Sequence, residues 1–230
     1  MADCFLYNCC NHKDCDKEFC IRKYKITNIF KASLIPENKW VKQSLKIDED
    51  GTDYNEFLQL ADIDKNIVDF IKSGKNIYLH SSNCGNGKTS WALRLAGDYI
   101  TSPKIWPKAS NQCLVLFISV PRLLLSLKED ISKKSDYVSY IKKNVLDADL
   151  VIWDDIAAKV GTEFELTHLF NFIDTRIARK KSNIYTSNLN PIELDNALEA
   201  RLKSRVCYEN VIDIELHGAD KRFLSNKEAN

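Results

Sequence analysis

The sequence lacks any apolar run close to the roughly 20 residues that a membrane-spanning helix needs. It also lacks a net charge of any size, because 33 basic side chains face 32 acidic ones and the formal charge is +1. Bulk charge therefore gives no argument for binding nucleic acid or membranes, and a DNA-binding surface would have to be a local patch. No secretory signal is visible at the start of the sequence, so we expect a cytoplasmic protein without a membrane partner.

Cysteine is sparse over most of the chain but crowded at its beginning, where five of the eight cysteines fall. In a reducing compartment such crowding favours a metal site over disulfides. The four thiols that could close a tetrahedral zinc site are Cys4, Cys9, Cys15 and Cys20. Cys10 and His12 are alternative ligands. The spacing is not a standard C-x2-C pair, so reduced cysteines without a metal are the alternative interpretation.

Strands and helices alternate from residue 76 onward, and no internal repeat is visible. Nearly unbroken apolar strands are expected at 76–81, 114–118, 150–153, 183–187 and 211–216. Between and before them we expect helices at 54–72, 121–131 and 136–147, a long helix after the third strand, and another starting at Pro191. The pattern predicts an α/β fold whose five-stranded parallel sheet is flanked by helices. We divide the chain into a cysteine-rich unit, 1–46, whose amphipathic helix stops at Pro36, and an α/β domain, 47–230.

The loop after the first predicted strand carries a phosphate-binding pattern, Ser82-Asn83-Cys84-Gly85-Asn86-Gly87-Lys88-Thr89-Ser90. In a P-loop, backbone N–H groups surround phosphate oxygens, and glycines let the main chain come close. Lys88 would supply charge to the β- and γ-phosphates, and Thr89 would offer a hydroxyl to magnesium. A glycine-rich turn that happens to contain Lys-Thr is the alternative. The apolar strand before it and the helical pattern after it favour a nucleoside triphosphate site over residues 83–90.

Polar residues follow two later strands. Asp154 and Asp155 end the third strand, where Asp154 would hold magnesium opposite Thr89 and Asp155 would orient the attacking water or accept its proton. They could otherwise cap a helix. Asn188 follows the fourth strand and could position that water, or simply form a turn. Arg205 ends a later helix, where it could complement the helix dipole or act as an arginine finger in a neighbouring subunit.

Taken in order, GNGKTS, LVIWDDIAAK, IYTSNL and LEARLKSR resemble the AAA+ replicative helicase loaders of the DnaC/DnaI type, especially phage-encoded ones. The cysteine-rich start is similar to the zinc-binding, helicase-contact domain of the DnaI-like members. The resemblance implies an ATPase that binds single-stranded DNA and delivers a hexameric replicative helicase. The matched positions are Lys88 and Thr89 for Walker A, Asp154 and Asp155 for Walker B, Asn188 for sensor 1, Arg205 for the arginine finger and Arg222 for sensor 2. Two departures are Ser82, in place of the first P-loop glycine, and almost no lid after Leu216.

The resemblance also implies cofactors and partners. These are ATP, Mg²⁺ and Zn²⁺, a homo-oligomer or helicase-templated ring, and the host cytoplasm if a phage encodes the chain. In this family the segment after the second strand faces DNA, which here would use Arg122, Lys128, Lys133 and Lys134, unless these are an ordinary solvated face. Competing interpretations are a transposition-helper ATPase with the same core, and a nucleotide-gated adaptor with negligible turnover.

Overall fold

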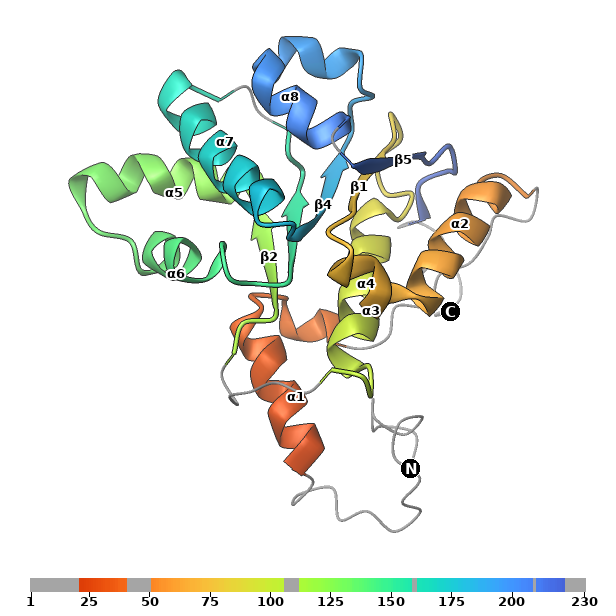
Figure 1. Ribbon diagram of the computed structural model, residues 1–230. Coiled ribbons are helices and arrows are strands. Elements are labelled where there is room, and N and C mark those ends of the chain that lie inside the picture. The colour runs from red at the N-terminus through yellow and green to blue at the C-terminus, as the bar shows by residue number, and fades with distance from the viewer. Residues whose placement is uncertain (1–20, 41–50, 106–111, 159–160, 209, 222–230) are drawn as a thin grey trace, which may run out of the picture.

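The computed structural model describes residues 21–40, 51–105, 112–158, 161–208 and 210–221. A five-stranded parallel sheet in the order β2-β3-β4-β1-β5 forms its centre (Figure 1). The strands are β1 (Asn76–His80), β2 (Val115–Ser119), β3 (Leu150–Asp154), β4 (Ser182–Ser187) and β5 (Val211–Glu215). Each observed boundary lies within one residue of the predicted one. The expected α/β fold with a five-stranded parallel sheet is confirmed.

Helices cover both faces of this sheet (Figure 1). On one face lie α1 (Ile21–Ala32), α2 (Tyr54–Lys65), α3 (Ile67–Lys72) and α4 (Lys88–Thr101). On the other lie α5 (Val120–Ser132), α6 (Asp136–Asn144), α7 (Glu163–Ala178) and α8 (Ala200–Cys207). Short 3-10 turns occupy η1 (Glu37–Lys39) and η2 (Glu193–Asn196). No helix within these described ranges is both long and apolar enough to cross a bilayer.

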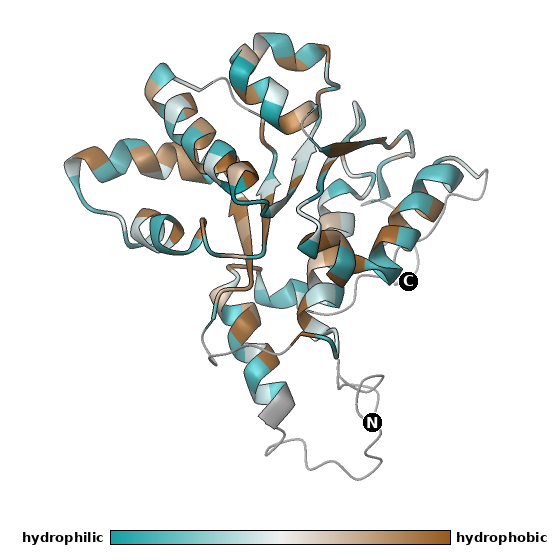
Figure 2. Ribbon diagram, in the orientation of Figure 1, coloured by the Kyte–Doolittle hydropathy of each residue, from teal (hydrophilic) through white to brown (hydrophobic). Residues whose placement is uncertain are grey.

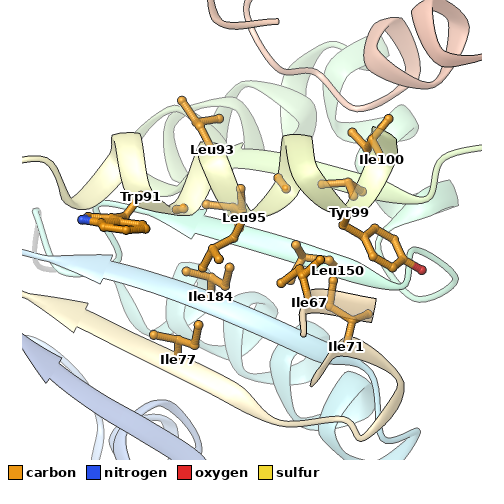
Figure 3. Close-up of a cluster of buried hydrophobic side chains, with 14 of the residues drawn as sticks. Ile67, Ile71, Ile77, Trp91, Leu93, Leu95, Tyr99, Ile100, Leu150 and Ile184 are labelled. Carbon is orange, nitrogen blue, oxygen red and sulfur yellow. The ribbon is translucent and has the colours of Figure 1, made fainter. Parts of the chain in front are cut away.

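Alternating strand residues supply the two hydrophobic cores. Ile77 of β1 and Ile184 of β4 enter the core beneath α4, while their neighbours Tyr78 and Tyr185 enter the opposite core. Figure 3 shows Trp91, Leu95 and Tyr99 of α4 packed over the first of these cores. Because both faces are covered, β2 and β3 are apolar almost throughout, whereas β4 buries the polar residues Ser182, Asn183, Thr186 and Ser187. Figure 2 shows polar and apolar residues alternating along the helices that cover the sheet.

Two predicted helices were wrong in extent. The helix expected over 54–72 breaks at Asn66, whose φ of −110° and ψ of 21° end α2 and start α3. The helix expected from Pro191 is instead η2 followed by α8, because the Asn190 side chain caps a tight turn at Ile192 and Glu193. Leu60 in the first of these segments and Leu194, Leu198 and Leu202 in the second are buried. Apolar spacing therefore located the buried side chains correctly although the backbone between them is interrupted.

The amphipathic helix predicted in the first 46 residues packs into the core of the α/β domain. Ile26, Ile29 and Phe30 of α1 are buried in the same core as α4 and β1. Just after α1, the Ser33 carbonyl oxygen accepts a 2.8 Å hydrogen bond from the Phe117 amide of β2. The helix ends at Ala32, before the expected stop at Pro36. The proposed zinc ligands Cys4, Cys9, Cys15 and Cys20, their alternatives Cys10 and His12, and Arg222 lie outside the described residues.

Candidate nucleotide-binding site

The loop between β1 and α4 bends at two glycines. Gly85 and Gly87 have φ angles of 74° and 111°, in the left-handed region that strains residues with a Cβ atom. The helix α4 then begins at Lys88, as predicted. The loop therefore presents successive backbone N–H groups ahead of a helix N-terminus, which is the arrangement that binds phosphate.

Side chains within the loop hold its shape. The Asn86 amide nitrogen donates to the Ser81 hydroxyl at 2.6 Å, and the Asn83 backbone N–H donates to that same oxygen at 3.0 Å. Lys88 is only 6% exposed, and its ammonium donates to the Asn83 carbonyl oxygen at 2.8 Å. Asn83 and Asn86 were predicted as nucleotide contacts, and their side chains bind the protein here. No sequence motif indicated that the Ser81 hydroxyl would accept these two hydrogen bonds.

Thr89 and Asp154 meet between α4 and the end of β3. The Thr89 hydroxyl donates a 2.8 Å hydrogen bond to Asp154 Oδ1, although 65 residues separate them in sequence. Burial raises the pKa of the Asp154 carboxyl, while hydrogen bonds from Thr89 and Thr186 act in the opposite direction. The structure thus brings together the hydroxyl and the carboxylate that the sequence assigned to one magnesium ion.

Asp155 adopts an uncommon backbone conformation beside this pair, with a φ of 56°. Its N–H donates to the Thr186 hydroxyl oxygen at 2.9 Å, and the next amide, that of Ile156, donates to the Thr186 carbonyl oxygen. Thr186 is fully buried and also donates to Asp154 Oδ1 at 2.8 Å. The sequence analysis placed the functional side chain of this strand at Asn188. Asn188 is exposed, and its side chain makes no hydrogen bond to the described part of the chain.

Arg205, the predicted arginine finger, and Arg201, four residues before it, lie against α7 of their own chain. Arg205 Nε donates to Asp174 Oδ1 at 2.7 Å, and both side chains are about one-third exposed, at 35% and 38%. The Arg201 guanidinium lies 5.4 Å from the centre of the Phe170 ring. Both arginines therefore contact α7 side chains of the same chain.

The chain after β5 crosses the P-loop, and we call residues 216–221 the C-terminal strap. Asn83 and Asn86 donate side-chain hydrogen bonds to the His217 and Leu216 carbonyl oxygens, at 2.9 Å and 3.1 Å. The Asp53 carboxylate accepts from the His217 and Gly218 amides at 2.6 Å and 2.8 Å. The strap is therefore bound on both sides, to the P-loop and to the turn before α2. No sequence motif indicated Asp53.

The donor set suits a hard cation bound with phosphate. A hydroxyl and a carboxylate are oxygen ligands of the kind Mg²⁺ takes from proteins, with the remaining positions filled by water and phosphate. The described residues contain no group of three or more His, Cys, Asp or Glu side chains that could hold a metal by themselves. Magnesium at Thr89 and Asp154 would accordingly depend on a bound nucleotide.

Comparison with known proteins finds similarity at the level of structure. No protein-family model matches the sequence, and no curated protein matches it. The DnaC helicase loader has a TM-score of 0.62 at 18% identity, covering 79% of this chain and 100% of that one. DnaI also has a TM-score of 0.62 at 18% identity, covering 80% of this chain and 95% of that one. AMPPCP-bound DnaA from Aquifex aeolicus has a TM-score of 0.58 at 18% identity, and 55% of that chain is spanned.

The chain shares the fold of these three proteins. In its sheet β4 lies between β1 and β3, so a residue at the end of β4 is close to both the P-loop and the acidic pair. Pairing of Trp153 with Tyr185 puts Asp154 next to Thr186 at the following position. Strand alternation could therefore have identified Thr186 as the β4 residue that faces the acidic pair.

Proposed function

We propose that this protein is an ATP-dependent loader of a replicative hexameric DNA helicase, acting in the cytoplasm. The observation that carries the proposal is the Thr89–Asp154 hydrogen bond, which joins the P-loop helix to the acidic end of β3. The match to 100% of the solved chain of the DnaC helicase loader supports a loader over other P-loop proteins.

Each site residue has a proposed role. The N–H groups of residues 83–90 bind the phosphates, and Lys88 leaves its contact with the Asn83 carbonyl to approach the β- and γ-phosphate oxygens. Thr89 and Asp154 hold Mg²⁺, whose chemistry when bound is to neutralise charge on those oxygens. Asp155 orients the attacking water or takes its proton, and Asn188 positions the same water.

A second subunit completes the proposed site. Arg205, on α8, would reach the nucleotide of a neighbouring copy as an arginine finger, an effect worth roughly 10³-fold or more in turnover. This requires a homo-oligomer or a ring assembled on the helicase. Arg222, outside the described residues, stays a prediction as the sensor 2 contact.

Single-stranded DNA is proposed to bind along α5 and the turn that follows it. Arg122, Lys133 and Lys134 are exposed, although the Arg122 guanidinium stacks 4.3 Å from the centre of the Tyr137 ring. Lys128 Nζ lies 3.4 Å from Glu165 Oε1, and this ion pair competes with a DNA phosphate for the Lys128 ammonium group. Leu123, Leu124 and Leu127 are buried, whereas Leu125 is 55% exposed.

Helicase contact is assigned to the cysteine-rich start, with zinc bound by Cys4, Cys9, Cys15 and Cys20. The test is ATP turnover with and without single-stranded DNA, together with co-purification of a hexameric replicative helicase. Truncation must stop at residue 20, because α1 supplies Ile26, Ile29 and Phe30 to the core. A loader turns over ATP and loses the helicase on this truncation. Preference for duplex DNA and a transposase would indicate the transposition helper, and negligible turnover would indicate the adaptor.

A further inference from the structure

We infer that Thr186 is a positioning residue for the acidic pair of the candidate ATPase site, fixing Asp154 and Asp155 together through one hydroxyl group. The inference rests on the proposed function for its consequence in turnover. Its geometric part concerns only this chain and can be tested without nucleotide.

The hydroxyl of Thr186 makes two hydrogen bonds with different partners. It lies 2.8 Å from Asp154 Oδ1 and 2.9 Å from the backbone nitrogen of Asp155. A hydroxyl has one proton to donate and lone pairs to accept, and a carboxylate can only accept. The direction of each bond is therefore determined. Thr186 donates to the Asp154 carboxylate and accepts from the Asp155 amide.

The position of Thr186 follows from strand register. Ile152 pairs with Ile184, and two residues further on Asp154 is opposite Thr186 on the same face of the sheet. That face is covered by α4, which carries Thr89. Asp154 Oδ1 thus accepts hydroxyl protons from both sides, from Thr89 on the helix and from Thr186 on the neighbouring strand.

The two bonds restrain different properties of the acidic pair. With Oδ1 held by two donors, rotation of the Asp154 carboxyl group is restricted, and no hydrogen bond from the described residues engages Oδ2. Asp155 has a left-handed φ of 56°, which is unfavourable for a residue with a side chain. The bond from its amide to Thr186 stabilises this conformation and so sets where the Asp155 carboxylate lies.

A packing role would make a different prediction. Thr186 is fully buried, so a side chain of the same shape could be needed there for packing alone. Thr186→Val keeps that shape and removes the hydroxyl, while Thr186→Ser keeps the hydroxyl and removes a methyl group. Positioning predicts that serine works and valine does not, whereas packing predicts the reverse order.

The experiment compares wild type, Thr186→Val and Thr186→Ser by three measurements. Hydrogen exchange of the Asp155 amide in nucleotide-free protein reports the hydrogen bond from that amide to the Thr186 hydroxyl oxygen. The Mg²⁺ dependence of affinity for a fluorescent ATP analogue reports the position of Asp154, and steady-state kinetics separate kcat from KM. In the valine variant we expect Asp155 exchange to accelerate roughly 3- to 10-fold, as for loss of a hydrogen bond between neutral groups, and kcat to fall roughly 10- to 100-fold, as for loss of a hydrogen bond to a charged group. The gain in affinity from Mg²⁺ should shrink, while affinity without Mg²⁺ and KM stay close to wild type.

Serine should restore all three measurements. A serine variant as impaired as valine, or a valine variant equal to wild type in exchange and Mg²⁺ dependence, would overturn the inference. If the valine protein does not fold, Thr186→Ala removes the hydroxyl without adding bulk and is compared with serine in the same way. A wild type without turnover would contradict the proposed ATPase, yet Asp155 exchange would still decide the role of Thr186.

Discussion

Arg205 donates to Asp174 across the contact between α8 and α7, with 2.7 Å between Nε and Oδ1. Both side chains are partly exposed, and exposed ion pairs contribute only about 0–1 kcal/mol to stability. A phosphate group of a neighbouring subunit could therefore compete with Asp174 for this guanidinium. The pair holds Arg205 in one orientation until such a competitor arrives.

Removing Arg205 should impair turnover, whereas removing its partner Asp174 should not. Arg205→Ala should leave nucleotide affinity unchanged and lower kcat by about 10³-fold, as for loss of an arginine finger. Asp174→Ala should retain turnover, because the arginine keeps its charge and gains freedom. Steady-state ATPase assays with the helicase present measure both. Equal losses in the two variants, or no loss in Arg205→Ala, would leave the pair with a structural role only.

Lys88→Ala should abolish nucleotide binding. Lys88 is nearly buried and its ammonium lies within the P-loop, so no other lysine can replace it there without rearranging the loop. Titration of a fluorescent ATP analogue should show a loss of affinity, and Lys72→Ala, which removes an exposed lysine at the end of α3, is the matched control. Tight binding retained by the Lys88 variant would argue against the P-loop assignment.

Elemental analysis of the purified protein should find about one zinc per chain. Changing Cys9 and Cys15 to serine should remove the metal, since four thiolates are needed for a closed site. Cys84→Ser is the control, because Cys84 is an exposed cysteine of the P-loop and not a proposed zinc ligand. Protein without zinc under metal-replete conditions would leave the cysteines as reduced thiols.

Asp53→Ala should release the C-terminal strap from the turn before α2. Two amide donors, His217 and Gly218, lose their carboxylate partner, which should lower the free energy of unfolding by about 1 kcal/mol. Hydrogen exchange at these two amides should rise well above wild type. Asp69→Ala, which removes a side chain that is 71% exposed, should change neither quantity. Unaltered exchange in the Asp53 variant would mean that the P-loop asparagines alone hold the strap.

A carboxyl pair between α2 and α4 should make stability depend on pH. Burial, together with the neighbouring Asp98 carboxyl, raises the pKa of Asp64 from 3.8 to about 6, against the opposing effect of Arg94. Because the folded protein favours protonated Asp64, this group stabilises the fold most at low pH, and the contribution is lost as pH rises through about 6.

Replacing Asp64 by asparagine should remove that dependence. The melting temperature of Asp64→Asn, relative to wild type, should increase between about pH 4 and about pH 8. Asp69→Asn, at an exposed position of α3, should show a constant difference from wild type over the same range. A flat difference for Asp64→Asn would mean that Asp64 titrates normally in the folded chain.

Sequence alone predicted the sheet well because β2 and β3 are nearly continuous apolar runs and each of the five strands is separated from the next by a helical pattern. The sequence also predicted that Thr89 and Asp154 belong to one site. Thr89 follows β1 and Asp154 ends β3, so both lie at the same edge of the parallel sheet. Asn66 was not foreseen as a helix break, because the apolar spacing continues across it and neither glycine nor proline marks the position. Local pattern cannot detect a turn that is imposed by packing.

Contacts between distant residues were the other omission. Asp53 and His217 are 164 residues apart, and nothing in either neighbourhood indicates that a carboxylate meets backbone amides there. Thr186 is an intermediate case, since its side chain had to face the acidic pair once the β3–β4 register was known. The motif directed attention to Asn188 instead, because motifs record residue types and not the faces of strands.

Attachment of α1 to the domain has a mechanical consequence. The carbonyl oxygen of Ser33 binds the edge strand β2, and that of Ala32 accepts from the Tyr140 hydroxyl of α6 at 2.6 Å. A pull applied to the chain ahead of Ile21 would thus be transmitted through α1 to β2 and α6. If a partner binds that end of the molecule, the force that it exerts would act on β2, the edge strand paired with β3.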